Sequence, residues 1–255
     1  MALTPRTLPW RVEETCWNAF PSLKQVLFGD FMLRFSPGVS RRGNSGNPLC
    51  ADPREIEAAV AAAEGLYRAQ GQPAIFRVPS VVDPALDRAL AAHGYTSEGE
   101  TCVLYGPMTG ITASADPDIE LLPTSSPEWL TAMSRLQGHS GKQAATYRRI
   151  VEAIAIPARF ACLRLAAEPA ALAFGAIHDG LLCYESVITD PQHRRQGLAR
   201  RVIAALAAWA LASGAEGACL QVEAGNAPAI ALYRGFGLDT ELHRYHYRRA
   251  PPSRD

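Results

Sequence analysis

The sequence predicts an α/β protein in which strands and helices alternate along the C-terminal part. Short apolar runs with strand propensity alternate there with segments whose apolar residues recur at helical spacing. Turn residues separate these segments; Ser213-Gly214, for example, ends the helix predicted after residue 197. The same alternation over residues 12–107 predicts a smaller α/β domain that precedes the first one.

Charge and hydropathy exclude several classes of partner. The 255 residues include 25 basic and 25 acidic side chains, so there is no bulk attraction to nucleic acid or to a membrane surface. An Arg-rich nucleic-acid binder is further disfavoured because the chain has no continuous basic stripe. No apolar run is long enough to span a bilayer, and residues 1–9 lack the pattern of a secretory signal. We therefore expect a cytoplasmic protein with no nucleic-acid or membrane partner.

The six cysteines form no Cys-x-x-Cys pair. Cys162, Cys183 and Cys219 lie inside predicted apolar strands, where a reduced cysteine behaves as a small hydrophobic residue. This pattern favours a reducing cytoplasm over a disulfide framework or a zinc site, so no metal is expected. His243 and His246 do not predict a metal site either, because their spacing places them on opposite faces of a strand.

The stretch that is most informative about function is a strand, a basic loop and a helix start over residues 181–200. The first N–H groups of a helix have no partner inside the helix, and the helix dipole gives that end a partial positive charge. Gly197 would let a phosphate approach this backbone, and Arg194, Arg195 and Arg200 would add charge for a pyrophosphate. An ordinary solvated loop is the alternative for this motif taken alone.

A second motif follows the first at a fixed distance. Residues 217–224 read as another strand, and a helix start with Asn and Tyr comes directly after it. The two motifs are Arg194-x-x-Gly197-x-Ala199 and Val222-x-x-x-Asn226-x-x-Ala229-x-x-Leu232-Tyr233-x-x-x-Gly237. In this order and context they resemble the GCN5-related N-acetyltransferase (GNAT) family, and the resemblance implies a GNAT-like mixed central sheet flanked by helices.

The resemblance implies an acetyl-CoA-dependent N-acetyltransferase. Acetyl-CoA would be the co-substrate, no metal would be needed, and a primary amine of a small molecule or a peptide would attack the thioester directly. A non-catalytic CoA or acyl-CoA-binding module with a GNAT fold is the alternative, because fold does not fix function. Such a module would retain the loop but lack the proton donor, and the presence of Tyr233 favours the enzyme.

The resemblance also implies which residues hold the cofactor. The basic loop would bind the pyrophosphate, and the exposed backbone of residues 187–189 would pair with the pantetheine arm. A backbone N–H of Val187 or Ile188 would stabilise the thioester oxyanion. The expected cofactor-binding residues are Val187, Ile188, Thr189, Arg194, Arg195, Gln196, Gly197, Leu198, Ala199, Arg200 and Asn226.

Two side chains are expected to be catalytic. Tyr233 would protonate the departing thiolate, since a phenol with the usual pKa of about 10 keeps its proton at neutral pH. Glu185 is a carboxylate in an otherwise apolar strand, and burial would raise its pKa and make it a base for the amine. A bound water as the base, or a Glu185 paired with a buried arginine, are the alternatives. Strand alternation places Cys183, Glu185 and Val187 on one face.

The acceptor pocket is expected near two helices, over residues 126–137 and 142–155, because this region shapes that pocket in the family. His139 and Tyr147 are candidates to touch the acceptor, or else ordinary surface and packing residues. The sequence is compatible with a monomer or a homodimer.

The expected domains are an N-terminal α/β domain over 1–107, a linker over 108–117, an acetyl-CoA-binding domain over 118–250 and a disordered tail over 251–255. The N-terminal order of elements echoes parts of the GNAT fold, with Gly94-Tyr95 after its last helix. This suggests a tandem arrangement with a degenerate first copy. No Gly loop precedes its long helix, so an unrelated packing domain is the alternative.

Overall fold

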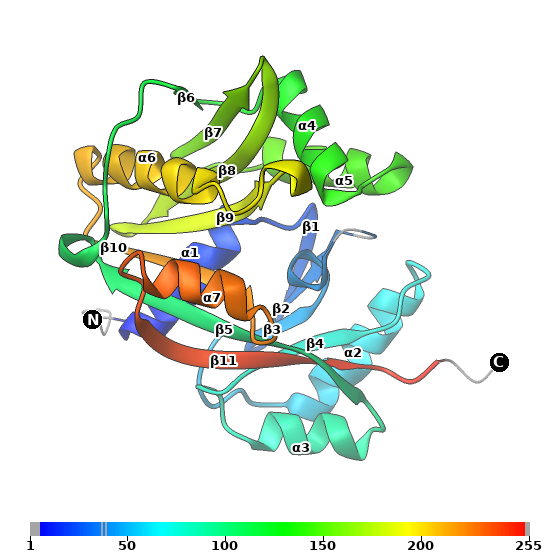
Figure 1. Cartoon of the computed structure of the whole chain (residues 1–255). Coiled ribbons are helices and arrows are strands. Elements are labelled where there is room, and N and C mark those ends of the chain that lie inside the picture. Colours follow the sequence, from blue (N-terminus) through cyan, green and yellow to red (C-terminus); the bar gives the residue numbers. More distant parts are fainter. Residues whose placement is uncertain (1–5, 37, 39, 253–255) are drawn as a thin grey trace. The chain divides into compact units, whose positions relative to one another are not determined.

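The computed structural model describes residues 6–36, 38 and 40–252 (Figure 1). These residues form two compact units. Unit 1 consists of the described parts of residues 1–21, 104–222 and 226–242. Unit 2 consists of the described parts of residues 22–103, 223–225 and 243–255. No helix within the described ranges is long and apolar enough to cross a membrane.

Unit 1 is a mixed sheet with helices on both faces. Its elements are α1 (Leu8–Ala19), residues 104–107 of β5 (Thr96–Pro107), the short helix η2 (Met108–Gly110), β6 (Ile119–Leu122), α4 (Pro127–Gln137), α5 (Gly141–Glu152), β7 (Ala158–Leu165), β8 (Glu168–His178), β9 (Leu181–Thr189), η3 (Pro191–His193), α6 (Leu198–Ala212), β10 (Gly217–Glu223) and α7 (Ala227–Arg234). Strands β6 to β9 pair antiparallel in sequence order, and β10 pairs parallel with β9. The predicted GNAT-like mixed sheet is therefore confirmed.

The two faces of this sheet are covered by different helices. On one face, a Cβ added at Gly175 of β8 would meet Leu206 and Trp209, so this face packs against α6. On the other face, Phe174 of β8 makes an edge contact with Trp129 of α4, and α1 packs against β8 and β9 as well. The face that α6 leaves uncovered is thus closed by α1 and α4.

Local signals explain where α4 begins and ends. The hydroxyl of Ser126 accepts a hydrogen bond from the Trp129 N–H at 3.1 Å, and Pro127 occupies the first turn. Gly138 ends the helix in the left-handed conformation, with φ of 70°. These caps agree with the helix that the sequence predicts over residues 126–137, and they place the buried Trp129 on the sheet.

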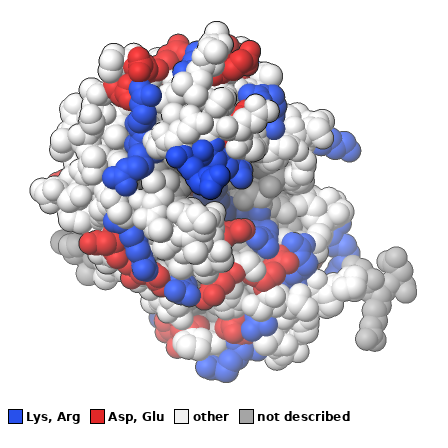
Figure 2. Space-filling view, viewed as in Figure 1, with Lys and Arg blue, Asp and Glu red and all other residues white. Residues whose placement is uncertain are grey.

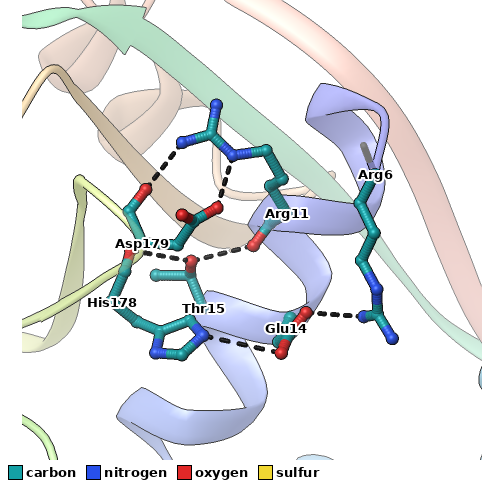
Figure 3. Close-up of polar contacts among 6 residues, drawn as sticks. All are labelled: Arg6, Arg11, Glu14, Thr15, His178 and Asp179. Atoms are coloured by element: carbon teal, nitrogen blue, oxygen red, sulfur yellow. Dashed lines mark hydrogen bonds and ion pairs between the residues drawn. The ribbon is translucent and has the colours of Figure 1, made fainter. Parts of the chain in front are cut away.

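Polar contacts fix α1 to the turn between β8 and β9 (Figure 3). Arg11 donates to the Asp179 carboxylate and, at 2.6 Å, to the Asp179 carbonyl. The Thr15 hydroxyl donates to the Arg11 carbonyl at 2.8 Å, and Glu14 pairs with Arg6 and His178. Exposed pairs of this kind stabilise by less than about 1 kcal/mol each, so they set the register of α1 more than its stability.

Unit 2 repeats the order of elements found in unit 1. Its elements are β1 (Lys24–Phe28), β2 (Phe31–Phe35), η1 (Arg41–Gly43), β3 (Gly46–Pro48), α2 (Ile56–Arg68), β4 (Ile75–Pro79), α3 (Ala85–Ala92), residues 96–103 of β5 and residues 243–249 of β11 (Thr240–Arg249). An antiparallel meander β1-β2-β3 is followed by α2 and by β4, which runs parallel to β3. Unit 1 has the same succession in β7-β8-β9, α6 and β10.

The compact units divide the chain differently from the sequence-based domains. Helix α1 belongs to unit 1 because its apolar side packs on β8 and β9, and residues 243–249 belong to unit 2 because β11 pairs antiparallel with β4. The predicted linker is held in unit 1, where Arg201 binds Asp116 at 2.6 and 2.9 Å. The separate folding of residues 118–250 stays a prediction. Residues 253–255 of the predicted tail lie outside the described residues.

Gly237 provides a test of the packing in unit 1. Its φ is +107°, and an added Cβ would lie 2.2 Å from the Gly110 carbonyl oxygen. We expect Gly237→Ala to cost at least about 2 kcal/mol of unfolding free energy, which lowers Tm by roughly 4–8 °C. Gly110→Ala is the control, since its Cβ would meet no atom within 4 Å. Equal Tm values for both variants in thermal unfolding would contradict this packing.

Candidate active site

The site begins where β9 and β10 part. The parallel register between them contains three pairs and ends at Cys183 and Cys219, although β9 continues to Thr189. Beyond this last pair, the backbone of residues 184–189 has no ladder partner on the β10 side within the described sheet. A chain with N–H and C=O groups of its own could pair there in the manner of an added strand.

A β-bulge lies in the same part of β9. Leu172 pairs with Ile188 and Phe174 with Glu185, so β9 has one residue more than β8 between these pairs. Ser186 has a φ of +51°, which is uncommon for a residue with a side chain. The predicted strict alternation is therefore wrong beyond Glu185. Because paired residues share a face, Glu185 lies on the same side as Ile188, and Val187 falls within the bulge.

A pocket of about 580 Å³ opens beside this part of the strand. Its lining residues are Val187, Ile188, Thr189, His193, Arg194, Arg195, Gly197, Leu198, Ala199, Arg200, Asn226, Pro228, Ala229, Leu232 and Tyr233. Of the residues expected to bind the cofactor, the pocket gathers all but Gln196, which is exposed next to it. Apart from the catalytic candidate Tyr233, the sequence-based list of cofactor residues lacks four that line the pocket: His193, which directly precedes the first motif, and Pro228, Ala229 and Leu232, which lie inside the second.

The loop before α6 has the shape of an anion site. Gly197 is the N-cap of α6 with a φ of 77°, and Arg195 has a φ of 61°. Residues in the left-handed conformation turn successive N–H groups toward one side of the loop, and such concavities bind anions. An added Cβ on Gly197 would meet no protein atom within 4 Å, so the space before the helix is open. Basic side chains gather on the surface where α6 begins (Figure 2).

Helix α7 contributes two of the predicted residues. The Asn226 side chain caps this helix, since its Oδ1 accepts from the Ala229 N–H at 3.2 Å. Tyr233 lines the pocket and is only 9% exposed. Burial, together with the nearby charge of Glu185, raises the pKa of Tyr233 to about 12. The phenol therefore keeps its proton at neutral pH.

Glu185 lies deeper than the pocket lining. It is 2% exposed and points to the sheet face that α6 does not cover. Its Oε1 is 3.9 Å from the Cys183 Sγ. The structure thus brings Glu185 close enough to Tyr233 for its charge to affect that phenol, without making it a wall of the pocket.

Three thiols gather behind Glu185. The Sγ atoms of Cys16, Cys183 and Cys219 all lie within 4.8 Å of one another, and all three residues are buried. Hydrogen bonding with Cys16, together with burial, raises the pKa values of Cys183 and Cys219 well above the usual range. The sequence pattern treats these cysteines as separate hydrophobic residues, because it contains no sign that α1 packs on β9.

The residues expected near the acceptor meet at the bulge. The Tyr147 hydroxyl of α5 donates to the Ser186 Oγ at 2.9 Å, and the ring of His139 packs edge-on against Tyr147. Burial lowers the pKa of His139, which favours its neutral form. Tyr147 is 1% exposed, so in this structure it is a buried residue that supports the bulge through its hydrogen bond to Ser186.

Comparisons with known proteins show which family and fold this chain shares. The model of the family described as "Probable histone acetyltransferase Rv0428c C-terminal" matches residues 10–248. An uncharacterised N-acetyltransferase of Bacillus subtilis, YobR, is 27% identical over 244 residues, which cover 93% of this chain and 97% of YobR. Among solved structures, a GCN5-related N-acetyltransferase from Kribbella flavida has a TM-score of 0.72 at 18% identity, with 96% of each chain covered. A tandem GNAT protein from the clavulanic acid biosynthesis pathway has a TM-score of 0.60 at 15% identity, with 82% of this chain and 76% of that chain covered.

The Tyr147–Ser186 hydrogen bond can be measured with a double-mutant cycle. We expect the unfolding free energies of Tyr147→Phe, Ser186→Ala and the double variant to give a coupling of about 1 kcal/mol, the usual value of a neutral hydrogen bond. Chemical denaturation of the four proteins gives this number. A coupling close to zero would mean that the bond does not support the bulge in solution.

Proposed function

Because the chain belongs to the family described as "Probable histone acetyltransferase Rv0428c C-terminal", a group of GNAT acyltransferases, we propose that it transfers the acetyl group of acetyl-CoA to a primary amine. The acceptor is a small molecule or a peptide. The observation that carries this proposal is that β9 parts from β10 beside the N-terminus of α6, and that the unpaired end of β9 and the start of α6 line the same pocket. The basic loop before α6 suits the pyrophosphate of acetyl-CoA, and the unpaired strand suits its pantetheine arm.

The cofactor would lie along the pocket with its pyrophosphate at the start of α6. The N–H groups of Leu198, Ala199 and Arg200 lie in the first turn of the helix, where the backbone has no acceptor of its own. Arg194 and Arg195 are exposed beside them and would neutralise the two phosphate charges. The pantetheine amides would pair with the free edge of residues 187–189. Asn226 would hydrogen-bond the cofactor through its Nδ2, because its Oδ1 already caps α7.

The protein must then stabilise the oxyanion, remove a proton from the amine and protonate the departing thiolate. The amine nitrogen attacks the thioester carbon, and the N–H of Val187, which lies within the bulge, or of Ile188, which follows it, stabilises the oxyanion. The acceptor must be a neutral amine when it attacks, so its ammonium form first gives a proton to Glu185 or to a bound water. The C–S bond breaks, and Tyr233 gives its proton to the CoA thiolate. A pKa of about 12 keeps Tyr233 protonated until that step.

The repeated order of elements supports a tandem arrangement in which the first copy has lost its cofactor site. Helix α2 corresponds in order to α6, and both have an N-cap in the left-handed conformation, Glu55 at φ 54° and Gly197 at φ 77°. The first turn of α2 also carries Glu57. Two carboxylates at this position would repel a pyrophosphate. One chain is therefore expected to bind one acetyl-CoA, whether it is a monomer or a homodimer.

A non-catalytic acyl-CoA-binding module would also have the basic loop and the point where β9 parts from β10. What separates the two functions is the proton donor, and Tyr233 lies in the pocket with a raised pKa. Six cysteines without a disulfide are consistent with a cytoplasmic location for the enzyme.

Gly197→Glu tests the cofactor site. The new carboxylate would enter the open space where the pyrophosphate is expected, so the affinity for CoA should fall at least tenfold in calorimetric titration. Gly214→Glu is the matched control, because Gly214 follows the other end of α6, also with positive φ and open surroundings. Equal affinity of both variants and the unchanged protein would remove the loop from the site.

Tyr233→Phe tests catalysis separately from binding. We expect kcat to fall about 100-fold, the usual effect of a general acid, while the Kd for acetyl-CoA changes less than about twofold. Tyr184→Phe is the control, since Tyr184 is a buried phenol on β9 whose hydroxyl has no partner among the described residues. Release of thiol with an accepted amine gives the rate. An unchanged kcat in Tyr233→Phe would assign protonation of the thiolate to water.

A further inference from the structure

The three thiols behind Glu185 come from three elements that converge at one point of unit 1. Cys16 lies on α1, Cys183 on β9 and Cys219 on β10. Cys183 and Cys219 form the last pair of the parallel ladder, so they stand at the point where the two strands part. Cys16 approaches them from the covering helix, with its Sγ 3.7 Å from that of Cys183. None of the three is more than 4% exposed.

The separation between Cys16 and Cys183 matches that of two ligands in a tetrahedral metal site. A metal–sulfur bond of about 2.3 Å places two sulfur ligands about 3.8 Å apart. The Cys16–Cys183 distance is 3.7 Å, and all three Sγ–Sγ distances are below 4.8 Å. A carboxylate oxygen bound at about 2.0 Å would lie roughly 3.5 Å from a sulfur in the same tetrahedron. Glu185 Oε1 is 3.9 Å from Cys183 Sγ but is not within 4.8 Å of all three sulfur atoms, so the Glu185 side chain would have to move toward the cluster to become the fourth ligand.

We propose that Cys16, Cys183 and Cys219 form a closed binding site for a thiophilic divalent cation of the Zn²⁺ class, with Glu185 as the fourth ligand. Thiolates select such soft cations, and a closed four-ligand set is typical of a structural zinc site. Binding releases the three thiol protons to water and forms three metal–sulfur bonds without any change of oxidation state. Because the cluster is buried, the cation enters while the chain folds.

A cation bound at this site would affect the acetyl transfer in the neighbouring pocket. A carboxylate that binds a cation is not available to take the proton of the attacking amine. The loaded protein is therefore expected to turn over more slowly than the metal-free protein. This consequence depends on the proposed function, whereas the binding itself does not.

The experiment is refolding of the reduced full chain with excess Co²⁺ or Cd²⁺, followed by removal of unbound metal. The expected result is one equivalent of metal in native mass spectrometry, together with the sulfur-to-metal charge-transfer absorption of a multi-thiolate site. The Cys16→Ala and Cys219→Ala variants should each bind at least tenfold more weakly. Cys162→Ala is the matched control, because Cys162 is equally buried on β7 but lies outside the cluster, and it should bind like the unchanged protein.

Two results would overturn the site. One is the absence of tightly bound metal in the refolded unchanged protein, as shown by mass spectrometry. The other is charge-transfer absorption that persists in Cys16→Ala and Cys219→Ala, because the metal would then bind elsewhere. Circular dichroism of each variant confirms folding before the comparison. These readouts need no acceptor substrate, so the metal site can fail while the transferase proposal stands, and the reverse.

Discussion

The site depends on the point at which β9 loses its partner in the middle of a sheet. Unpaired backbone groups at such a position are costly unless another group bonds to them. Strands β9 and β10 pair only as far as Cys183 and Cys219, and the bulge at Ser186 then turns β9 away from the regular pleat. Val187, Ile188 and Thr189 of β9, which lie beyond the last pair with β10, line the pocket. The same pocket reaches the N-terminus of α6. The interruption of the ladder therefore places the unpaired strand next to the anion site of the loop.

The features of the site that are local in sequence could be predicted. A glycine at the N-cap, arginines before it and the apolar period of α6 are properties of neighbouring residues, and each has a direct physical meaning. The Ser126–Pro127 start and the Gly138 stop of α4 are equally local. For this reason the expected cofactor residues coincide with the pocket lining almost throughout.

The features that depend on long-range contacts could not be predicted. The bulge falls at Ser186, a residue that rarely adopts positive φ, and the Tyr147 hydroxyl that supports it comes from 39 positions earlier in the chain. The approach of Cys16 to Cys183 depends on the docking of α1, for which no local pattern exists. The linker over residues 108–117 stays a prediction; its Asp116 binds Arg201, which lies 85 positions later in the chain, and composition gives no sign of that contact.

Glu185 shows how one physical condition permits two functions. A carboxylate in a nearly water-free position is costly as an anion, and a proton or a metal cation lowers that cost by neutralising its charge. The burial that would let Glu185 accept a proton from an amine therefore also suits it to a cation. Three thiols at the parting of the strands provide the other ligands for such a cation. Proton transfer and metal binding would then compete for the same oxygen, and the occupancy of the thiol cluster would decide which of the two Glu185 performs.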